Sequence, residues 1–192
     1  MRADLLIENA LVTNDGSTDP EQLSYGQLLV EEGTVLRALA ANVLPLQVIV
    51  EVGSYTGKSA MCLAAGSAEG NLVPVYAVDL WTSGVSKRGR GFRARVKGEA
   101  PSRKRFHMPE TLAIFQQRQV VFDTAKVLRP IMGASTSVAA KLSTRTGFLI
   151  GLLFIDAEHT YEACKADFEA WSPMVDRTGV IALHDYAKPD GS

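Results

Sequence analysis

The stretch Glu51–Ala60, EVGSYTGKSA, decides the interpretation of this sequence, because it places glycines directly after an apolar run. The preceding residues LQVIV are apolar and rich in β-branched side chains, which is typical of a buried strand. The following residues KSAMCLAAG predict a helix that ends at Gly66. A strand, a glycine turn and a helix in this order are typical of a ligand-binding turn, and its ligand has to be identified.

The first candidate ligand is a nucleoside triphosphate, since the turn ends in Gly57, Lys58 and Ser59. A phosphate-binding P-loop has a glycine, four residues and then Gly-Lys-Ser, so that successive N–H groups surround a phosphate. That first glycine would stand where the chain has Val52, and the glycine follows one residue later. The turn is therefore too short for a P-loop. An NTPase stays an alternative because the run LLFID resembles a strand and acid that hold magnesium.

The rest of the chain repeats this unit of strand and helix. Apolar spacing and composition predict helices over residues 26–43, 58–66, 109–126 and 161–175. Short apolar runs predict strands over residues 46–54, 73–80, 127–135, 151–159 and 179–186. This alternation favours an α/β fold, namely a Rossmann-like, doubly wound, mostly parallel sheet with helices on both faces. The last helix is expected to bury one apolar stripe, made of Cys164, Phe168, Trp171 and Val175.

Length and composition favour one globular domain without a membrane segment. The chain has 192 residues, of which 46% are apolar and 21% charged. We expect a lead-in over residues 1–25 and a single domain over residues 26–192. No apolar run reaches the roughly 20 residues of a membrane helix, and the N-terminus lacks the apolar core of a signal peptide. Cys62 and Cys164 match no zinc or redox spacing, so we expect buried thiols in the cytoplasm.

Charge is unevenly distributed along the chain. The formal net charge is −1, yet residues 87–105 include nine Lys or Arg and a single acid, Glu99. This segment predicts a basic loop over about residues 82–108. Either the loop is merely solvated, or it covers the site and attracts an anionic acceptor. Nucleic acid is disfavoured as a partner, because only Phe92 and Phe106 supply aromatic side chains for stacking.

Polar residues follow most of the predicted strands. Because the carboxyl ends of parallel strands lie at one edge of a sheet, ligands bind there. These ends carry the turn from Gly53 to Gly57, and then Asp79, Ser135, Asp156, His159, His184 and Asp185. Asp79 comes 26 residues after Gly53, where an acid can accept hydrogen bonds from both hydroxyls of a ribose. A dinucleotide is not indicated, because GSYTGK lacks the pattern Gly-x-Gly-x-x-Gly.

These motifs resemble those of class I S-adenosylmethionine-dependent methyltransferases. The resemblance rests on VIVEVGSYTGKSA, VYAVDLW and LLFIDAEHTYEACKADFEAWSPMVDRTGVIALHDY, and it covers roughly residues 48–186. It extends to the small-molecule O-methyltransferases of the macrocin- and cephalosporin-cluster type. By this resemblance S-adenosylmethionine is the cofactor, Asp79 binds its ribose, and Leu80 or Trp81 lies near its adenine. The other cofactor-binding positions that the resemblance implies are Glu51, Gly53, Ser54, Gly57 and Ser135.

The resemblance also implies two ways of activating an acceptor hydroxyl. In metal-dependent relatives, carboxylates after the fourth and fifth strands hold magnesium, and here these are Asp156 and Asp185, with Glu158 nearby. His184 stands where many relatives have a second acid, which leaves the requirement for magnesium open. His159 is expected either to act as a general base, or to cap the following helix or hydrogen-bond the neighbouring loop. The expected catalytic residues are thus Asp156, His159 and Asp185, the two acids also being metal ligands.

The resulting expectation is an enzyme that methylates a hydroxyl of a small molecule such as a sugar or a natural product. Two further alternatives are a catalytically silent nucleoside-binding or assembly protein of the same fold, and a nucleic-acid methyltransferase. Relatives normally continue with another helix and an antiparallel strand pair, whereas this chain ends at Ser192. We therefore expect a trimmed or truncated domain without these strands, and a homo-oligomer in which a partner subunit covers the free sheet edge.

Overall fold

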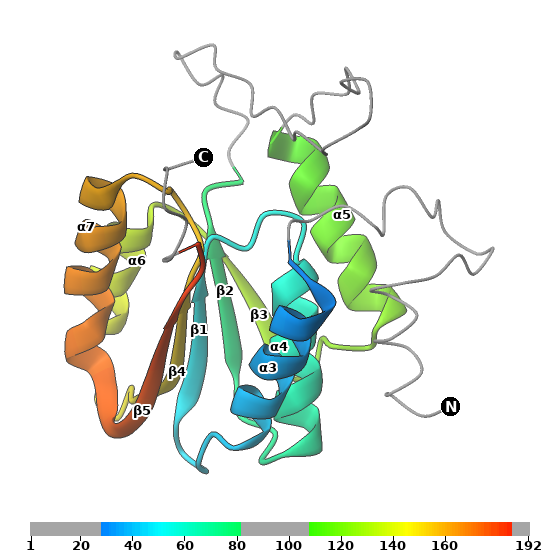
Figure 1. Ribbon diagram of the computed structural model, residues 1–192, viewed down its shortest axis with the longest axis horizontal. Helices are drawn as coiled ribbons and strands as arrows, with labels where there is room; N and C mark the ends of the chain where they lie inside the picture. Colours follow the sequence, from blue (N-terminus) through cyan, green and yellow to red (C-terminus); the bar gives the residue numbers. More distant parts are fainter. Residues whose placement is uncertain (1–27, 82–107, 186–192) are drawn as a thin grey trace.

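The computed structural model of the chain describes residues 28–81 and 108–185 (Figure 1). The helices are α3 (Val30–Ala41), α4 (Lys58–Glu69), α5 (Met108–Val121), α6 (Ser135–Leu142), α7 (Tyr161–Trp171) and the short 3-10 helix η1 (Ser172–Met174). The strands are β1 (Val48–Val52), β2 (Val75–Asp79), β3 (Leu128–Met132), β4 (Ile150–Ile155) and β5 (Val175–Leu183). The expected lead-in and nearly all of the expected basic loop lie outside the described residues.

The five strands form one parallel sheet, which confirms the predicted doubly wound α/β fold. Their order is β3-β2-β1-β4-β5, and every neighbouring pair is parallel. The chain moves outward from β1 to β3, returns to place β4 beside β1, and continues outward to β5. The winding direction therefore reverses between β1 and β4. In open α/β sheets, ligands bind at the carboxyl ends of the strands beside such a reversal, which is the upper side of Figure 1.

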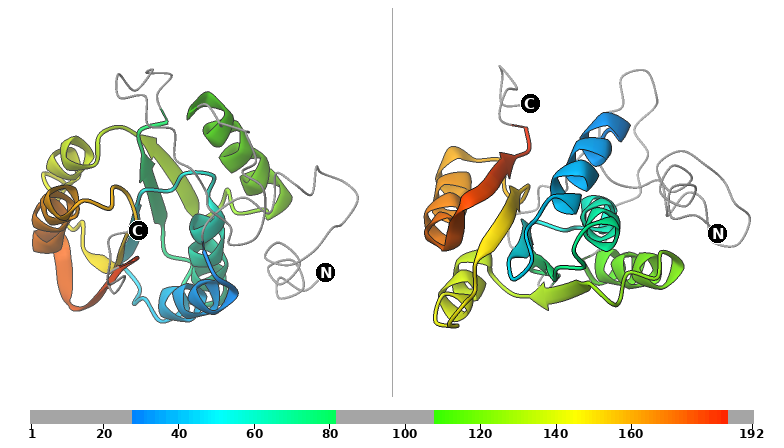
Figure 2. Two further views of the ribbon diagram at one scale, coloured as in Figure 1. Left: turned by 45° about the horizontal axis from the view of Figure 1, so that its top comes forward. Right: turned by 90° about the horizontal axis from the view of Figure 1, so that it is seen from below.

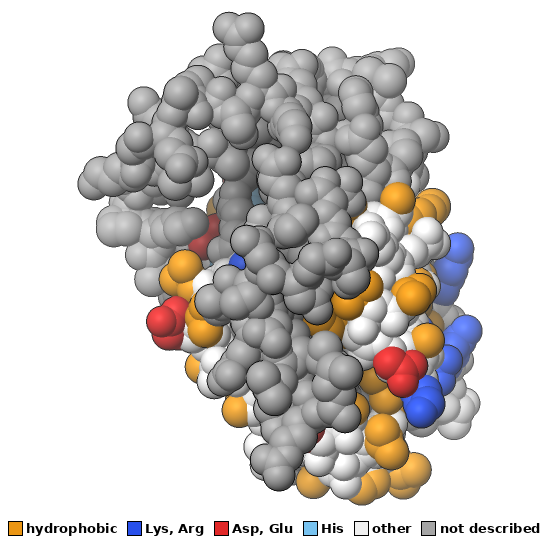
Figure 3. All heavy atoms as spheres, turned by 90° about the vertical axis from the view of Figure 1, so that its right-hand side faces the viewer, with side chains coloured by type: hydrophobic (Ala, Val, Ile, Leu, Met, Phe, Trp, Pro, Cys, Tyr) orange, Lys and Arg blue, Asp and Glu red, His pale blue; other side chains and the backbone are white. Residues whose placement is uncertain are grey.

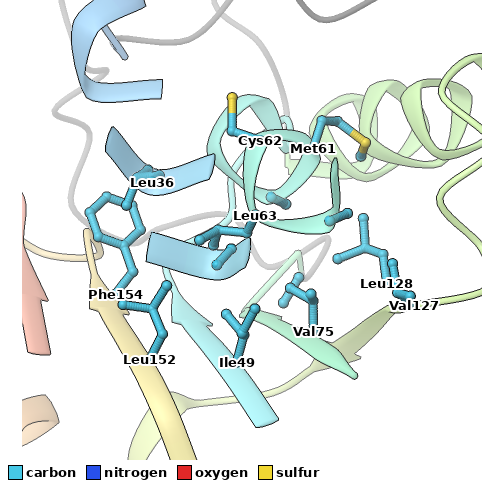
Figure 4. Packing of buried hydrophobic residues seen from close by; sticks show 14 of the residues in the cluster. Leu36, Ile49, Met61, Cys62, Leu63, Val75, Val127, Leu128, Leu152 and Phe154 are labelled. Atoms are coloured by element: carbon cyan, nitrogen blue, oxygen red, sulfur yellow. The ribbon is translucent and has the colours of Figure 1, made fainter. Parts of the chain in front are cut away.

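Helices cover both faces of the sheet, with α3, α4 and α5 on one face and α6 and α7 on the other (Figure 2). Each face has its own apolar cluster. On the first face Leu36 and Leu63 from the helices pack against Ile49 and Phe154 from the strands (Figure 4). On the second face Trp171 is fully buried. Strands β1 and β4 are buried along their whole length, which explains why their sequences show no alternation of apolar and polar residues.

Helix α4 is longer than expected, because Gly66 does not end it. The helix continues to Glu69, and Gly70 follows as its C-cap. Gly66 lies where α3 packs on α4, and a β-carbon at this position would overlap the carbonyl oxygen of Arg37. The prediction that Gly66 ends the helix is therefore wrong, since this glycine permits a close approach of two helices instead of a turn.

The second half of the chain departs from prediction in two places. Helix α6 follows β3 directly, in a segment that was expected to end a strand. Helix α7 ends at Trp171, and Val175 begins β5. Phe168 is 41% exposed, whereas Asp167 and Trp171 are buried. The predicted apolar stripe of Cys164, Phe168, Trp171 and Val175 is therefore wrong, because α7 turns a face that includes an acid toward the sheet and α6.

Strands β3 and β5 are the two edges of the described sheet. Pro130 lies on β3 opposite Ala77 of β2, and an edge strand tolerates proline because one row of its backbone groups has no partner strand. Figure 3 shows the side of the molecule that carries α5, where apolar side chains are scattered over the described surface. In residues 28–81 and 108–185, every helix is too short or too polar to cross a bilayer.

Candidate active site

The ends of the central strands meet at the carboxyl edge of the sheet. Backbone hydrogen bonds continue between these ends beyond the strands themselves. Gly53 N donates to a carbonyl oxygen of β2 at 2.9 Å, and Asp156 N donates to one of β1 at 2.8 Å. His184 N donates to a carbonyl oxygen of β4 at 3.0 Å. The residues expected at three strand ends are therefore held next to one another by the backbone.

Gly53 has a packing role in addition to its expected role beside the cofactor. Its φ is +90°, a conformation that favours glycine. A β-carbon here would also overlap the backbone of Asp156 and Ala157 in the loop after β4. Glycine at this position therefore lets the loops after β1 and β4 come into direct contact at the reversal point.

The turn after β1 is closed by short-range hydrogen bonds and anchored to β2 by Asp79. Gly57 N donates to Ser54 O at 2.6 Å. The carboxylate of Asp79 accepts from Tyr55 N at 2.8 Å on Oδ2 and from Trp81 N at 3.1 Å on Oδ1. Each carboxylate oxygen has a second lone pair, so Asp79 keeps the capacity to accept from ribose hydroxyls. The carboxylate of Asp79, which is expected to bind the ribose, is thus held in a fixed orientation by the loops that flank it.

The two residues expected near adenine lie in different environments. Trp81 is 2% exposed, packs on Phe115 with ring centroids 4.8 Å apart, and donates from Nε1 to Tyr55 O at 2.7 Å. Leu80 is 48% exposed. Trp81 thus packs in the interior and holds the turn through Tyr55 O. Of the two residues, Leu80 is the one whose side chain faces solvent. A contact between Leu80 and adenine stays a prediction.

A buried arginine supports the turn, and sequence reasoning missed it. Arg118 on α5 is 2% exposed, and its Nη1 donates to both Thr56 O and Thr56 Oγ1 at 2.8 Å. Burial lowers the pKa of Arg118 to about 10. Arg118 lies 62 residues from Thr56 in the sequence. No local sequence pattern could therefore have identified this contact. Helix α5 thereby fixes the backbone of the turn from outside the β1–α4 unit.

Glu51 is a fully buried acid beneath the turn. The Ser59 hydroxyl donates to its Oε1. Its Oε2 and the Ser54 hydroxyl, which lies close enough to lower the pKa of Glu51, form no well-aligned hydrogen bond within the described residues. Burial raises the pKa of Glu51 to about 7, and the carboxylates of Asp156 and Asp79 add to the rise while nearby hydroxyls oppose it. The site therefore contains an acid that titrates near neutral pH and has spare hydrogen-bonding capacity.

We expect Glu51→Gln to flatten the pH dependence of stability. The pKa is raised in the folded state, so between about 4.5 and 7 the unfolded chain loses this proton first and stability falls as pH rises. Between pH 5 and pH 8 the parent should lose about 2–3 kcal/mol more than the variant. Urea unfolding at both pH values measures this, with Glu162→Gln, an exposed acid, as control. Equal losses in parent and Glu51→Gln would show that Glu51 ionises normally.

Four ionisable residues gather after β4 and β5, and a fifth joins them from α3. Nδ1 of His184 lies 3.1 Å from Oδ1 of Asp156 and 3.3 Å from Oδ1 of Asp185. Nε2 of the same ring lies 3.3 Å from Oε2 of Glu32. Nδ1 of His159 lies 3.6 Å from Oδ2 of Asp185. The structure brings together the residues that the sequence predicted here, and adds Glu32, which it did not predict.

His184 occupies the space between the two acids that were expected to hold magnesium. Its Nδ1 lies between Asp156 and Asp185 without a well-aligned hydrogen bond to either. The Asp156 carboxylate is the largest cause that raises the pKa of His184 to about 9, so the ring is cationic at neutral pH. Within the described ranges, no group of three or more His, Cys, Asp or Glu is arranged to hold a metal ion. As they stand, these residues do not fit magnesium unless His184 moves.

His159 stands just before α7 with 45% of its side chain exposed. The N-cap of α7 is Thr160, whose hydroxyl oxygen accepts from Ala163 N at 3.4 Å. The expectation that His159 caps this helix is therefore wrong, whereas a contact with a neighbouring loop is present, since His159 lies beside Asp185. Asp185, its neighbour, has φ of +58°, a conformation that is uncommon outside glycine and is found more often at functional sites.

Ser135 has a structural partner that the sequence did not indicate. It is the first residue of α6, and its hydroxyl oxygen accepts from Nε1 of Trp171 at 2.8 Å. Asp167 is buried beside it; burial raises the pKa of this acid and the Ser135 hydroxyl lowers it. The hydroxyl thus links α6 to α7, and a contact between Ser135 and adenine stays a prediction.

Comparison with known proteins decides the family. A family profile described as a methyltransferase domain matches residues 50–186, from within β1 through the turn after it to the end of β5, and includes Asp156, His159, His184 and Asp185. The chain belongs to this methyltransferase family. The matched residues include the Gly53 turn and Asp79, whereas Glu32 on α3 lies before them.

Solved methyltransferases share this fold at low sequence identity. One is the O-methyltransferase TomG from Streptomyces achromogenes in complex with S-adenosylmethionine, with TM-score 0.58, 16% identity, and coverage of 100% of this chain and 72% of that one. Another is a putative caffeoyl-CoA O-methyltransferase from Staphylococcus aureus, with TM-score 0.57, 16% identity, and coverage of 96% and 66%. A third is CalS11, a TDP-rhamnose 3′-O-methyltransferase of calicheamicin biosynthesis, with TM-score 0.53, 17% identity, and coverage of 97% and 77%. The chain spans only 62% and 63% of the length of two other matched structures.

Proposed function

We propose that this protein is an S-adenosylmethionine-dependent methyltransferase that methylates a hydroxyl group of a small molecule. The proposal rests on one observation: a candidate nucleoside-binding turn and a candidate general base lie at the same edge of the sheet. A glycine turn anchored by Asp79 suits a nucleoside, and beside it His159 contacts Asp185 as a candidate base. Family membership and the O-methyltransferases of similar fold support this reaction class.

The residues around the turn fit the proposed cofactor. S-adenosylmethionine supplies a methyl group on a sulfonium ion, together with an ammonium, a carboxylate and a ribose. The buried Oε2 of Glu51 and the Ser54 hydroxyl form no well-aligned hydrogen bond among the described residues, and they suit an ammonium group reached directly or through a water molecule. The Asp79 carboxylate, oriented by Tyr55 N and Trp81 N, suits the ribose hydroxyls. The NTPase alternative has no such support. A hydrogen bond from Gly57 N to Ser54 O closes the turn, which leaves it too short to surround a phosphate.

The acceptor side of the site supports proton removal by histidine. His159 accepts the proton of the acceptor hydroxyl, and Asp185 orients the ring and stabilises its positive charge. The acceptor oxygen then forms a bond to the methyl carbon while the bond from sulfur to that carbon breaks, which leaves S-adenosylhomocysteine as the second product. The cationic His184 ring offsets the charge of Asp156 and Asp185, so that one acid remains available to His159.

Magnesium is the second candidate for activating the hydroxyl. Asp156 and Asp185 at adjacent strand ends favour it, because carboxylates are the ligands that magnesium prefers. This alternative requires His184 to leave the space between them. Chelation separates the two cases.

The proposed acceptor is an anionic small molecule. Caffeoyl-CoA and TDP-rhamnose, in the names of two proteins of similar fold, both carry phosphate groups. The basic segment 87–105, which lies outside the described residues, supports an anionic acceptor by its charge. We place the protein in the cytoplasm, because Cys62 and Cys164 are free; Cys62 is buried and Cys164 half-buried. A homo-oligomer stays part of the proposal, because the outer edge of β5 has no partner strand among the described residues.

The test of this function is methyl transfer itself. The purified chain is incubated with methyl-labelled S-adenosylmethionine and either caffeoyl-CoA or TDP-rhamnose, with and without a chelator. Mass spectrometry should find a product heavier by one methyl group, in an amount equal to the S-adenosylhomocysteine released. Cofactor binding without any methylated product from these or other hydroxyl compounds would favour the catalytically silent alternative.

We expect Asp79→Ala to weaken cofactor binding by at least about tenfold. The reason is the loss of hydrogen bonds from the ribose to a carboxylate, each contributing about 1.5–3 kcal/mol. Titration calorimetry with S-adenosylhomocysteine measures the change, and Glu162→Ala controls for the loss of one negative charge. Thermal melting of both variants shows whether the anchored turn has unfolded. Unchanged affinity in a folded Asp79→Ala protein would remove Asp79 from the cofactor site.

A further inference from the structure

The first turn of α3 reaches both halves of the proposed site. Nζ of Lys58 donates to Leu28 O at 2.9 Å, which ties the start of α3 to the first residue of α4. Oε2 of Glu32 lies 3.3 Å from Nε2 of His184, which is 152 residues away in the sequence. The segment before β1 therefore connects the cofactor turn with the carboxyl end of β5.

Glu32 also has a local role. Its Oε2 accepts from Leu29 N at 2.7 Å, which is one half of a capping box at the start of α3. A capping residue needs only the backbone of its own helix. The contact between the same oxygen and His184 is an additional feature, since it joins α3 to the opposite end of the chain.

His184 is held on three sides. Its ring stands almost perpendicular to that of Phe154, at an interplanar angle of 85° and a centroid distance of 6.2 Å. Nδ1 lies between the carboxylates of Asp156 and Asp185, and Nε2 faces Glu32. The side chain is only 8% exposed. Because each nitrogen faces a carboxylate, a rotation that exchanges them would first have to break the contact with Glu32.

We propose that Glu32 is a positioning residue of the methyltransferase site: by holding Nε2 of His184, it keeps Nδ1 between Asp156 and Asp185. This inference rests on the proposed methyl transfer. Asp185 in turn contacts His159, so a continuous series of contacts runs from α3 to the proposed base. The Glu32 side chain is 39% exposed, and an ion pair with one exposed partner contributes little to stability. Its effect is therefore expected in the rate.

The test compares Glu32→Gln with Glu31→Gln. Both residues are acids in the first turn of α3. Gln at position 32 can still accept from Leu29 N, but it lacks the negative charge that Glu32 presents to Nε2 of His184. We expect Glu32→Gln to lower kcat about tenfold or more, because small errors in position are costly in catalysis. Affinity for S-adenosylhomocysteine and the melting temperature should match those of Glu31→Gln. Equal kcat values in the two variants would overturn the inference.

A double-variant cycle identifies the route of the effect. If Glu32 acts through His184, then Glu32→Gln should change kcat by less than about twofold once His184→Asn is present. A loss as large in that background as in the parent would contradict the positioning role. Both rates are measured with S-adenosylmethionine and caffeoyl-CoA or TDP-rhamnose, whichever the parent methylates.

A spectroscopic readout keeps this inference separate from the proposed function. The ring ¹⁵N signals of His184, assigned by their loss in His184→Asn, should shift in Glu32→Gln and stay in place in Glu31→Gln. If the parent methylates neither acceptor, the proposed acceptors fail while the ring signals still decide the contact. Ring signals that are unchanged in Glu32→Gln would overturn the inference whatever the activity.

Discussion

His159→Ala should lower the rate of methyl transfer by about 10²–10⁴-fold, the range that one general base contributes. The side chain is 45% exposed at the carboxyl edge of the sheet, and Asp185 contacts its Nδ1 at 3.6 Å. The contact that the structure gives this side chain is with Asp185, and not with the Gly53 turn or with Asp79. Affinity for S-adenosylhomocysteine should therefore change little.

A chelator and two controls complete this experiment. If histidine is the base, EDTA should leave the rate unchanged and Asp185→Asn should also lower it. Glu162→Ala, an exposed change on α7, should behave as the parent does. Loss of turnover on chelation, with a small effect of His159→Ala, would instead support magnesium held by Asp156 and Asp185. Full activity of both His159→Ala and the chelated enzyme would refute both mechanisms.

Gly53→Ala should be the most damaging change to the fold of the site. A β-carbon would overlap the backbone of Asp156 and Ala157, and backbone cannot move aside as a flexible side chain can. The φ of +90° adds strain of about 1–2 kcal/mol for any residue with a β-carbon. We expect a total loss of about 3–5 kcal/mol in unfolding free energy, together with loss of cofactor binding.

Gly147→Ala is the matched control for this change. Gly147 has φ of +77°, but a β-carbon there would meet no atom within 4 Å. This variant should show the conformational strain alone, about 1–2 kcal/mol, with normal cofactor binding. Urea unfolding of the two variants measures the difference. Equal losses would show that the contact between the loops after β1 and β4 is not required.

The fold was predictable because its central strands are unambiguous. The buried runs VIVEV and IGLLFI contain too few polar residues for surface strands, and each is followed by a turn and a helix. The bounds of helices were less predictable, since they depend on packing partners. Gly66 has the residue type of a helix end, yet the close approach of α3 requires a glycine inside the helix.

The residues of the site that lie at the ends of strands could be predicted from the sequence. Asp79 ends β2, Asp156 follows β4 directly and Asp185 comes two residues after β5, so topology alone places all three at the carboxyl edge of the sheet. Glu32 and Arg118 could not be predicted, because each reaches the site from a helix and contacts a residue distant in the sequence. Their roles depend on how helices pack on the sheet, which periodicity does not specify.

The position of the His184 ring between Asp156 and Asp185 also could not be predicted from the sequence. The order His184, Asp185 places both residues at the end of β5, but their side chains follow from backbone geometry there. Asp185 adopts a positive φ, and His184 is enclosed by Phe154 and Glu32. The sequence predicted that Asp156 and Asp185 hold a metal ion, whereas the structure places the cationic ring of His184 between them.

Titration of the purified chain with S-adenosylhomocysteine, S-adenosylmethionine and ATP tests the central claim most directly. The turn after β1 is too short to surround a phosphate, and Asp79 is oriented for a ribose. Calorimetry should therefore show saturable binding of both sulfur nucleosides and no binding of ATP, with Asp79→Ala weakening the former. Saturable binding of ATP with no response to either sulfur nucleoside would contradict the assignment of this site.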